Sequence, residues 1–101
     1  MVKKRSEKSI DAENRVHLVG VIASAITSRE GVLARRIEIP MPGAREMVDI
    51  ECEKGENLRV FRSLRVDQWV EIEGQLRRRY WRDGARLASR TYVEVSRLKA
   101  R

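Results

Sequence analysis

The residues best suited to chemistry are arginines and aromatic residues gathered in residues 70–97, VEIEGQLRRRYWRDGARLASRTYVEVSR. Two adjacent rings lie among the arginines, and Asp83 is the only carboxylate between the first and the last of them. The arginines are Arg77, Arg78, Arg79, Arg82, Arg86 and Arg90. Guanidinium groups fork onto phosphate and stack on bases, and aromatic rings also stack on bases. The stretch therefore favours nucleic acid as the partner over small-molecule chemistry.

Trp81 is the first candidate for base stacking, and Tyr80 is the second. Adjacent residues of a strand point to opposite faces, so at most one of the two rings is expected to be a stacking platform. Packing against the hairpin itself or against another subunit is the alternative for both rings. The candidate phosphate contacts are Arg77, Arg78, Arg79, Arg82 and Arg86. For these arginines the alternative is a solvated surface.

Other kinds of site find little support in the sequence. Cys52 alternates with apolar residues and is expected in the core, and a single cysteine forms no internal disulfide. His17 has no histidine or cysteine partner, so neither a metal site nor a cofactor is predicted. The carboxylates Asp49, Glu51 and Glu53 lack an accompanying nucleophile. We predict a protein that is not an enzyme.

Length and charge set the broad class. The chain has 101 residues, which is enough for one small domain. Its formal charge of +7 favours an anionic partner. Residues 1–13 are polar, basic and without periodicity, which predicts a flexible arm before a single domain over residues 14–101. The longest apolar run, residues 18–26, is too short for a membrane span, and the start does not resemble a secretory signal. We expect a cytoplasmic protein without membrane contact.

Alternating apolar residues predict the strands that must position the arginines. Residues 14–24, 32–41, 46–53, 68–76 and 90–98 read as five strands, with a turn at residues 27–31. Asn57 is expected to cap a short helix over residues 57–65. Five strands, with a helix between the third and the fourth and a long 4–5 hairpin, match the all-β OB-fold, a Greek-key barrel. OB-folds bind single strands along an exposed strand face and its flanking loops.

Two segments carry a resemblance to the bacterial single-stranded DNA-binding proteins. Residues 14–24, NRVHLVGVIAS, resemble their first strand, and residues 70–95 resemble their fourth strand, 4–5 hairpin and fifth strand. The resemblance implies sequence-independent binding of single-stranded DNA in replication, repair or recombination. It also implies a homo-oligomer, most often a tetramer. Trp81 matches the stacking position of the hairpin, and Arg77, Arg79 and Arg82 match the basic positions around it.

Two departures from the family leave alternatives open. Met47 and Glu53 stand where the family has stacking aromatics on the third strand, and Asp49 stands at a position that is usually basic. These carboxylates would repel phosphate unless cross-strand arginines neutralise them. The chain also shows no acidic C-terminal tail, so recruitment of repair proteins by such a tail is not expected. The alternatives are a dimeric replication-restart protein resembling primosomal replication protein N, or a protein-interaction module with a degenerate DNA face.

Overall fold

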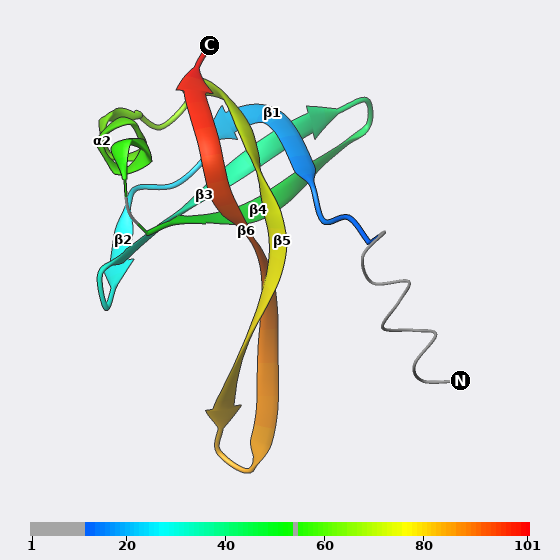
Figure 1. The fold of residues 1–101 in the computed structure, drawn as a ribbon. Coiled ribbons are helices and arrows are strands. Elements are labelled where there is room, and N and C mark those ends of the chain that lie inside the picture. Colours follow the sequence, from blue (N-terminus) through cyan, green and yellow to red (C-terminus); the bar gives the residue numbers. More distant parts are fainter. Residues whose placement is uncertain (1–11, 54) are drawn as a thin grey trace.

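The computed structural model describes residues 12–53 and 55–101, and the predicted order of strands and helix is confirmed (Figure 1). The first part of the chain forms four strands, the third and fourth of them a hairpin. A short helix and the long final hairpin follow. The elements are β1 (Val16–Ile22), β2 (Thr27–Arg29), β3 (Val32–Met41), β4 (Ala44–Cys52), α2 (Glu56–Ser63), β5 (Trp69–Asp83) and β6 (Arg86–Ala100).

The strands close into the barrel of an OB-fold. The sheet has the order β1-β5-β6-β4-β3-β2, and a further pairing of β1 with β3 closes the ring. Only β4 and β6 run parallel, with Ile50 opposite Val93. β2 is a short strand that pairs with the start of β3 outside the ring. Part of the turn expected at residues 27–31 is therefore strand, because Thr27–Arg29 folds back onto β3 and only Glu30 and Gly31 form the turn.

Alternation along the strands builds the core. Val70 and Ile72 of β5 are fully buried, whereas Trp69 and Glu73, which point to the other face, are exposed. Cys52 is buried among the same side chains, as its place in the alternating pattern predicts. The core residues are Ile22, Leu33, Ile37, Ile50, Cys52, Phe61, Leu64, Val70, Ile72, Val93 and Val95.

One core position is occupied by an arginine. Arg35 lies between Leu33 and Ile37 on the inner face of β3 and is only 6% exposed. Its guanidinium donates hydrogen bonds to the carbonyl oxygens of Phe61 (2.9 Å), Leu64 (2.6 Å) and Ser24 (3.2 Å). Desolvation lowers the pKa of Arg35. Arg35 satisfies carbonyls at the C-terminal end of α2 that the helix itself leaves unpaired.

The start of α2 differs from the expectation. Asn57 does not cap the helix, because Gly55 holds the cap position and no side chain donates or accepts a capping bond there. Asn57 lies within the first turn, and its amide nitrogen donates to the carbonyl oxygen of Ser96 at 2.7 Å. The predicted cap residue therefore ties α2 to β6.

The predicted basic arm, residues 1–13, lies outside the described residues except for Ala12 and Glu13. Asn14 joins the start of the described chain to β5. The Asn14 side chain accepts a hydrogen bond from the Leu76 amide at 2.8 Å and donates one to its carbonyl at 2.7 Å. The helix of the described residues falls short of the length and apolarity that crossing a membrane requires.

Candidate nucleic-acid interface

The arginine-rich stretch is a continuous two-stranded ribbon that projects from the barrel (Figure 1). β5 and β6 stay paired from Val70 opposite Ala100 to Asp83 opposite Arg86, next to the tip. Gly84 makes the turn with a positive φ of 66°, which a glycine adopts without strain. The sequence predicted a cationic hairpin, and the structure extends its two strands to the tip.

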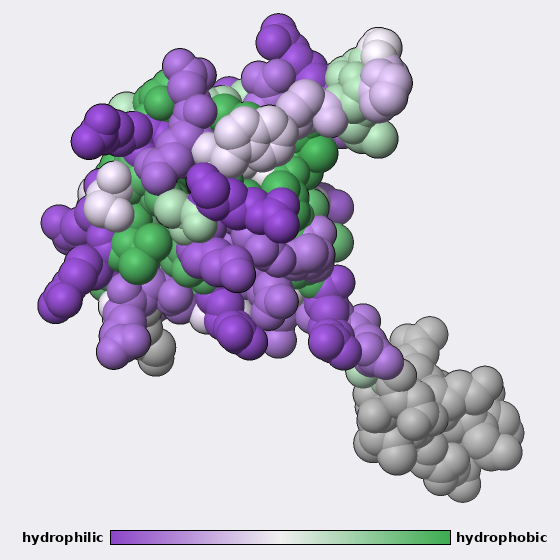
Figure 2. Space-filling view, turned by 90° about the horizontal axis from the view of Figure 1, so that it is seen from above, coloured by the Kyte–Doolittle hydropathy of each residue, from purple (hydrophilic) through white to green (hydrophobic). Residues whose placement is uncertain are grey.

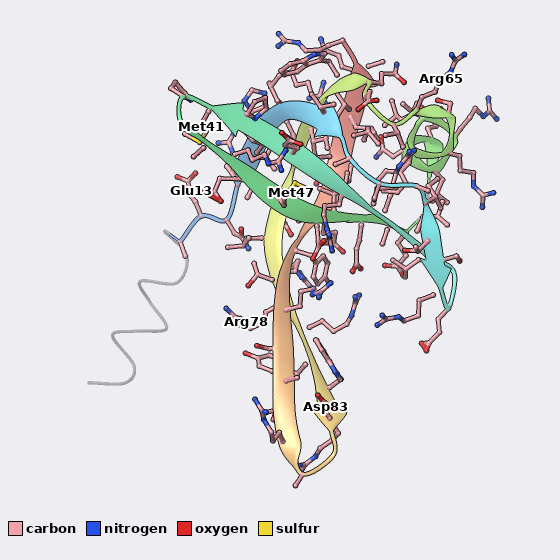
Figure 3. The ribbon with its side chains drawn as sticks, turned by 180° about the vertical axis from the view of Figure 1, so that it is seen from behind. Glu13, Met41, Met47, Arg65, Arg78 and Asp83 are labelled. Atoms are coloured by element: carbon pink, nitrogen blue, oxygen red, sulfur yellow. The ribbon has the colours of Figure 1, made fainter. Side chains whose placement is uncertain are left out.

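Adjacent residues of the ribbon point to opposite faces. We call one side the groove face; it carries Arg77, Arg79 and Trp81 of β5 and continues the outer surface of the barrel. The other side, the back face, continues the core-facing side of the strands and carries Arg78, Tyr80 and Arg82. In Figure 3, Asp83 lies on the side of the hairpin toward β2 and Arg78 on the side away from it.

The groove face of the hairpin lines a groove of about 760 Å³. Its opposite wall is the β2–β3 hairpin, which contributes Arg29 and Arg36, and its floor includes Asp49 and Glu51 of β4. Trp81 lines the groove and is 42% exposed. An exposed ring on the wall of an arginine-lined groove is an arrangement that can stack a base.

Glu51, on the floor of the groove, is neutralised by Arg79. The Arg79 guanidinium donates to both Glu51 carboxylate oxygens, at 2.5 and 2.6 Å, and lies 4.8 Å from the ring centre of Tyr92. The hydrogen bonds from Arg79 to Glu51 raise the pKa of Arg79. Bidentate pairs of this kind are among the stronger ion pairs in proteins. Arg79 therefore lines the groove, but its guanidinium is already paired with a carboxylate.

Asp49 is neutralised from both neighbouring strands. Arg36 of β3 lies 3.2 Å from one carboxylate oxygen, and Arg90 of β6 lies 3.3 Å from the other. The Arg36 contact follows from the register, in which Arg36 stands directly opposite Asp49. These pairs supply the cross-strand arginines that the acidic strand requires beside a phosphate backbone. Asp49 and Glu51 therefore do not present bare charge to the groove, while Glu53 forms no ion pair with another described residue and does not line the groove.

Other arginines of the hairpin and of β2 have no carboxylate partner within the described chain. Among the described residues, Arg29, Arg82 and Arg86 form no ion pair, and Arg78 donates only to the Ser89 hydroxyl, at 2.8 Å. Arg77 lies 3.9 Å from Glu94, at the limit of an ion pair between exposed groups. Binding phosphate at the unpaired arginines breaks no existing ion pair.

The structure divides the predicted site residues into two groups. Arg79 and Trp81 line the groove, with Arg77 and Arg86 on the same face of the hairpin, while Arg78, Tyr80 and Arg82 lie on the back face. Arg29 and Arg36 were missed by sequence reasoning, although the latter alternates with core residues on a predicted strand. Their contribution depends on the β2–β3 hairpin lining the same groove as β5 and β6, which are separated from it in the sheet by β4.

The opposite end of the barrel carries a separate set of ion pairs. His17 lies 2.6 Å from Glu71, and Lys99 and Arg101 approach the same carboxylate at 4.0 and 3.6 Å. The hydrogen bond with His17 lowers the pKa of Glu71. Seen from this end, hydrophilic side chains cover most of the surface (Figure 2). In residues 12–53 and 55–101, no histidine, cysteine or carboxylate cluster is arranged to hold a metal ion.

The sequence matches no protein-family model and no curated protein. Solved structures show the same fold. The mitochondrial single-stranded DNA-binding protein Rim1 of S. cerevisiae is 15% identical with a TM-score of 0.72, covering 88% of this chain and 96% of that one. The Plasmodium falciparum SSB in complex with ssDNA is 16% identical with a TM-score of 0.72, covering 88% and 95%.

A third structure represents another kind of OB-fold protein. The N-terminal domain of PriB from Thermoanaerobacter tencongensis, a dimeric structure, is 24% identical with a TM-score of 0.66. The match covers 86% of this chain and 94% of that one. All three likenesses extend over nearly the whole domain. They establish the OB-fold of this chain.

Proposed function

We propose that this chain binds single-stranded DNA without reading its sequence, through the groove and the hairpin. The observation that carries the proposal is Trp81, an exposed ring on the wall of an arginine-lined groove whose far wall carries Arg29, which forms no ion pair within the described chain. Similar structures include proteins described as binding single-stranded DNA, one of them in complex with ssDNA. The protein would act by binding alone, in support of replication, repair or recombination.

Each part of the groove has a distinct role in this proposal. Trp81 stacks on a base, while Arg29, across the groove, and Arg86, beside the tip on the same face as Trp81, contact phosphate. Arg79 and Arg90 hold Glu51 and Asp49, which keeps the carboxylates from repelling the strand. Stacking on any base and contact with any phosphate require no particular sequence.

Intrinsic fluorescence tests the proposal directly. In a chain carrying Trp69→Phe, Trp81 is the only tryptophan, and titration with oligothymidine at low salt should quench its emission. Trp81→Ala, followed by the anisotropy of a labelled oligonucleotide, should weaken binding about 5- to 150-fold, since one stacked base contributes about 1–3 kcal/mol. Absence of any binding to single strands at low salt would refute the proposal.

A second candidate is a replication-restart accessory or protein-interaction module with weak DNA affinity. The pairing of Arg36, Arg79 and Arg90 with carboxylates favours it, because those cations are already neutralised. So does the likeness to the dimeric PriB domain. A stable protein complex without measurable oligonucleotide binding would favour this candidate.

A homo-oligomer, dimer or tetramer, is proposed for both candidate functions, and light scattering measures its mass. The cytoplasmic location stays a prediction.

A further inference from the structure

The back face of the hairpin exposes large apolar side chains to solvent. Leu76, Tyr80 and Leu87 are 50%, 62% and 66% exposed. The register places Leu87 opposite Arg82 and Ser89 opposite Tyr80, so the three apolar side chains share one face. Exposed apolar side chains gathered on one surface usually mark a binding surface. The groove, which lies on the other side of the ribbon, makes no use of them.

The two arginines of the back face are free of carboxylates. Arg78 and Arg82 form no ion pair within the described chain, and no acidic residue shares their face between Leu76 and Thr91. On the groove face, by contrast, Arg77, Arg79 and Arg90 each face a carboxylate. The uncompensated positive charge of the hairpin therefore lies on its back face and at its tip.

The spacing of these side chains alternates cation and ring. Arg78 and Arg82 stand two residues before and after Tyr80, which places each about 6.6 Å along the strand from it. A ring with a cation on either side offers stacking to a base and charge to the flanking phosphates. Figure 3 shows Arg78 on the side of the hairpin away from β2, and thus away from the groove.

We infer that the back face is a second binding face for single-stranded nucleic acid, so that one hairpin holds two strand segments, one on each side. The inference rests on the function proposed for the groove. A second copy of this chain is a poorer occupant, because it would bring a net charge of +7 against unpaired arginines. Tyr80 stacks on a base of the second segment, and Arg78 and Arg82 contact its phosphates. A chain with two such faces bridges two segments of single-stranded nucleic acid, or one long nucleic-acid strand passes around the hairpin.

Stoichiometry distinguishes one binding face from two. The probe is a labelled oligothymidine of about eight nucleotides, within the site size of about 4–16 nucleotides per OB-fold. Under tight-binding conditions at low salt, the Trp69→Phe chain should bind two oligonucleotides per chain. Tyr80→Ala and the double variant Arg78→Gln/Arg82→Gln should each reduce this to one and leave the quench of Trp81 unchanged. All three side chains are exposed, so the fold should tolerate these changes.

A matched control separates local contact from general charge. Arg59→Gln/Arg62→Gln also removes two exposed arginines without an ion pair, but from α2, and should leave two oligonucleotides bound. One oligonucleotide per unaltered chain would overturn the inference and leave the proposed function intact. So would an equal loss in the α2 control, or back-face variants that change the oligomeric mass instead of the stoichiometry. No binding by the unaltered chain would overturn both proposals.

Discussion

At the scale of single residues, arginines of this chain have different roles that depend on the group each one contacts. Arg79 is committed to Glu51 by two hydrogen bonds, and Arg35 is buried against the carbonyls of α2. Arg82, three residues beyond Arg79 on the same strand, has no carboxylate partner within the described chain. The value of an arginine for binding phosphate therefore depends on its existing partner more than on its place in a basic run.

Glu51→Gln should strengthen the binding of single strands. The change removes one negative charge from the floor of the groove and frees the Arg79 guanidinium to contact phosphate. Because a charged contact of this kind contributes on the order of 1 kcal/mol, affinity for oligothymidine should rise roughly three- to tenfold. Anisotropy titration at constant salt measures it. Glu73→Gln makes the same charge change outside the groove and should have a smaller effect; an equal gain would contradict the role of Arg79.

The sequence predicts which face of a strand each side chain of the site occupies, but not which ion pairs form between strands that are distant in the sequence. The alternation rule correctly separates Trp81 from Tyr80, since facing is a local property of a strand. The same rule places Arg35 in the core between Leu33 and Ile37, a signal present in the sequence. The partners of Arg79 and Arg90 were beyond reach, because they depend on β4 lying parallel to β6, strands about forty residues apart.

At the scale of elements, the β5–β6 ribbon unites the barrel wall with the proposed binding arm. Strand propensity and the Asp83-Gly84 turn predict the hairpin, but the polar residues 27–31 predict a turn where the structure has the exposed strand β2. Its three residues form a strand only through pairing with β3. Where the ribbon leaves the barrel, the register of β5 and β6 shifts between Glu73 and Gly74. A β-bulge at such a shift bends the strand and increases its local twist.

Gly74→Ala should destabilise the barrel at this shift. A Cβ at position 74 would lie 2.1 Å from the backbone oxygen of Glu94 and 3.0 Å from a methyl group of Val93. Since the backbone of β6 must move to admit it, we expect a loss of about 1–3 kcal/mol in the free energy of unfolding, the usual range for overpacking. Urea denaturation measures the loss. Gln75→Ala, at the exposed neighbouring position, is the control, and equal stability of the two variants would argue against the close approach.

At the scale of the whole molecule, the net charge of +7 is divided into paired and unpaired cations. In residues 12–53 and 55–101, most carboxylates of the outer barrel surface hold an arginine, a lysine or a histidine, which leaves the unpaired positive charge of this part of the chain concentrated on the hairpin, β2 and α2. An anionic strand approaching the protein is therefore attracted first to the projecting elements. The barrel mainly holds these elements in position.

The salt dependence of binding should report how many of these cations meet phosphate. For single strands, the logarithm of affinity falls with the logarithm of salt concentration by about 0.7 for each neutralised phosphate. If only the unpaired Arg29, Arg78, Arg82 and Arg86 make contact, an oligothymidine that reaches both faces should give a slope of about −3. If the four arginines paired with Asp49, Glu51 and Glu94 also turned to phosphate, the slope would approach about −6. Anisotropy titrations over a range of salt concentrations distinguish the two, and the steeper slope would mean that the groove carboxylates release their arginines on binding.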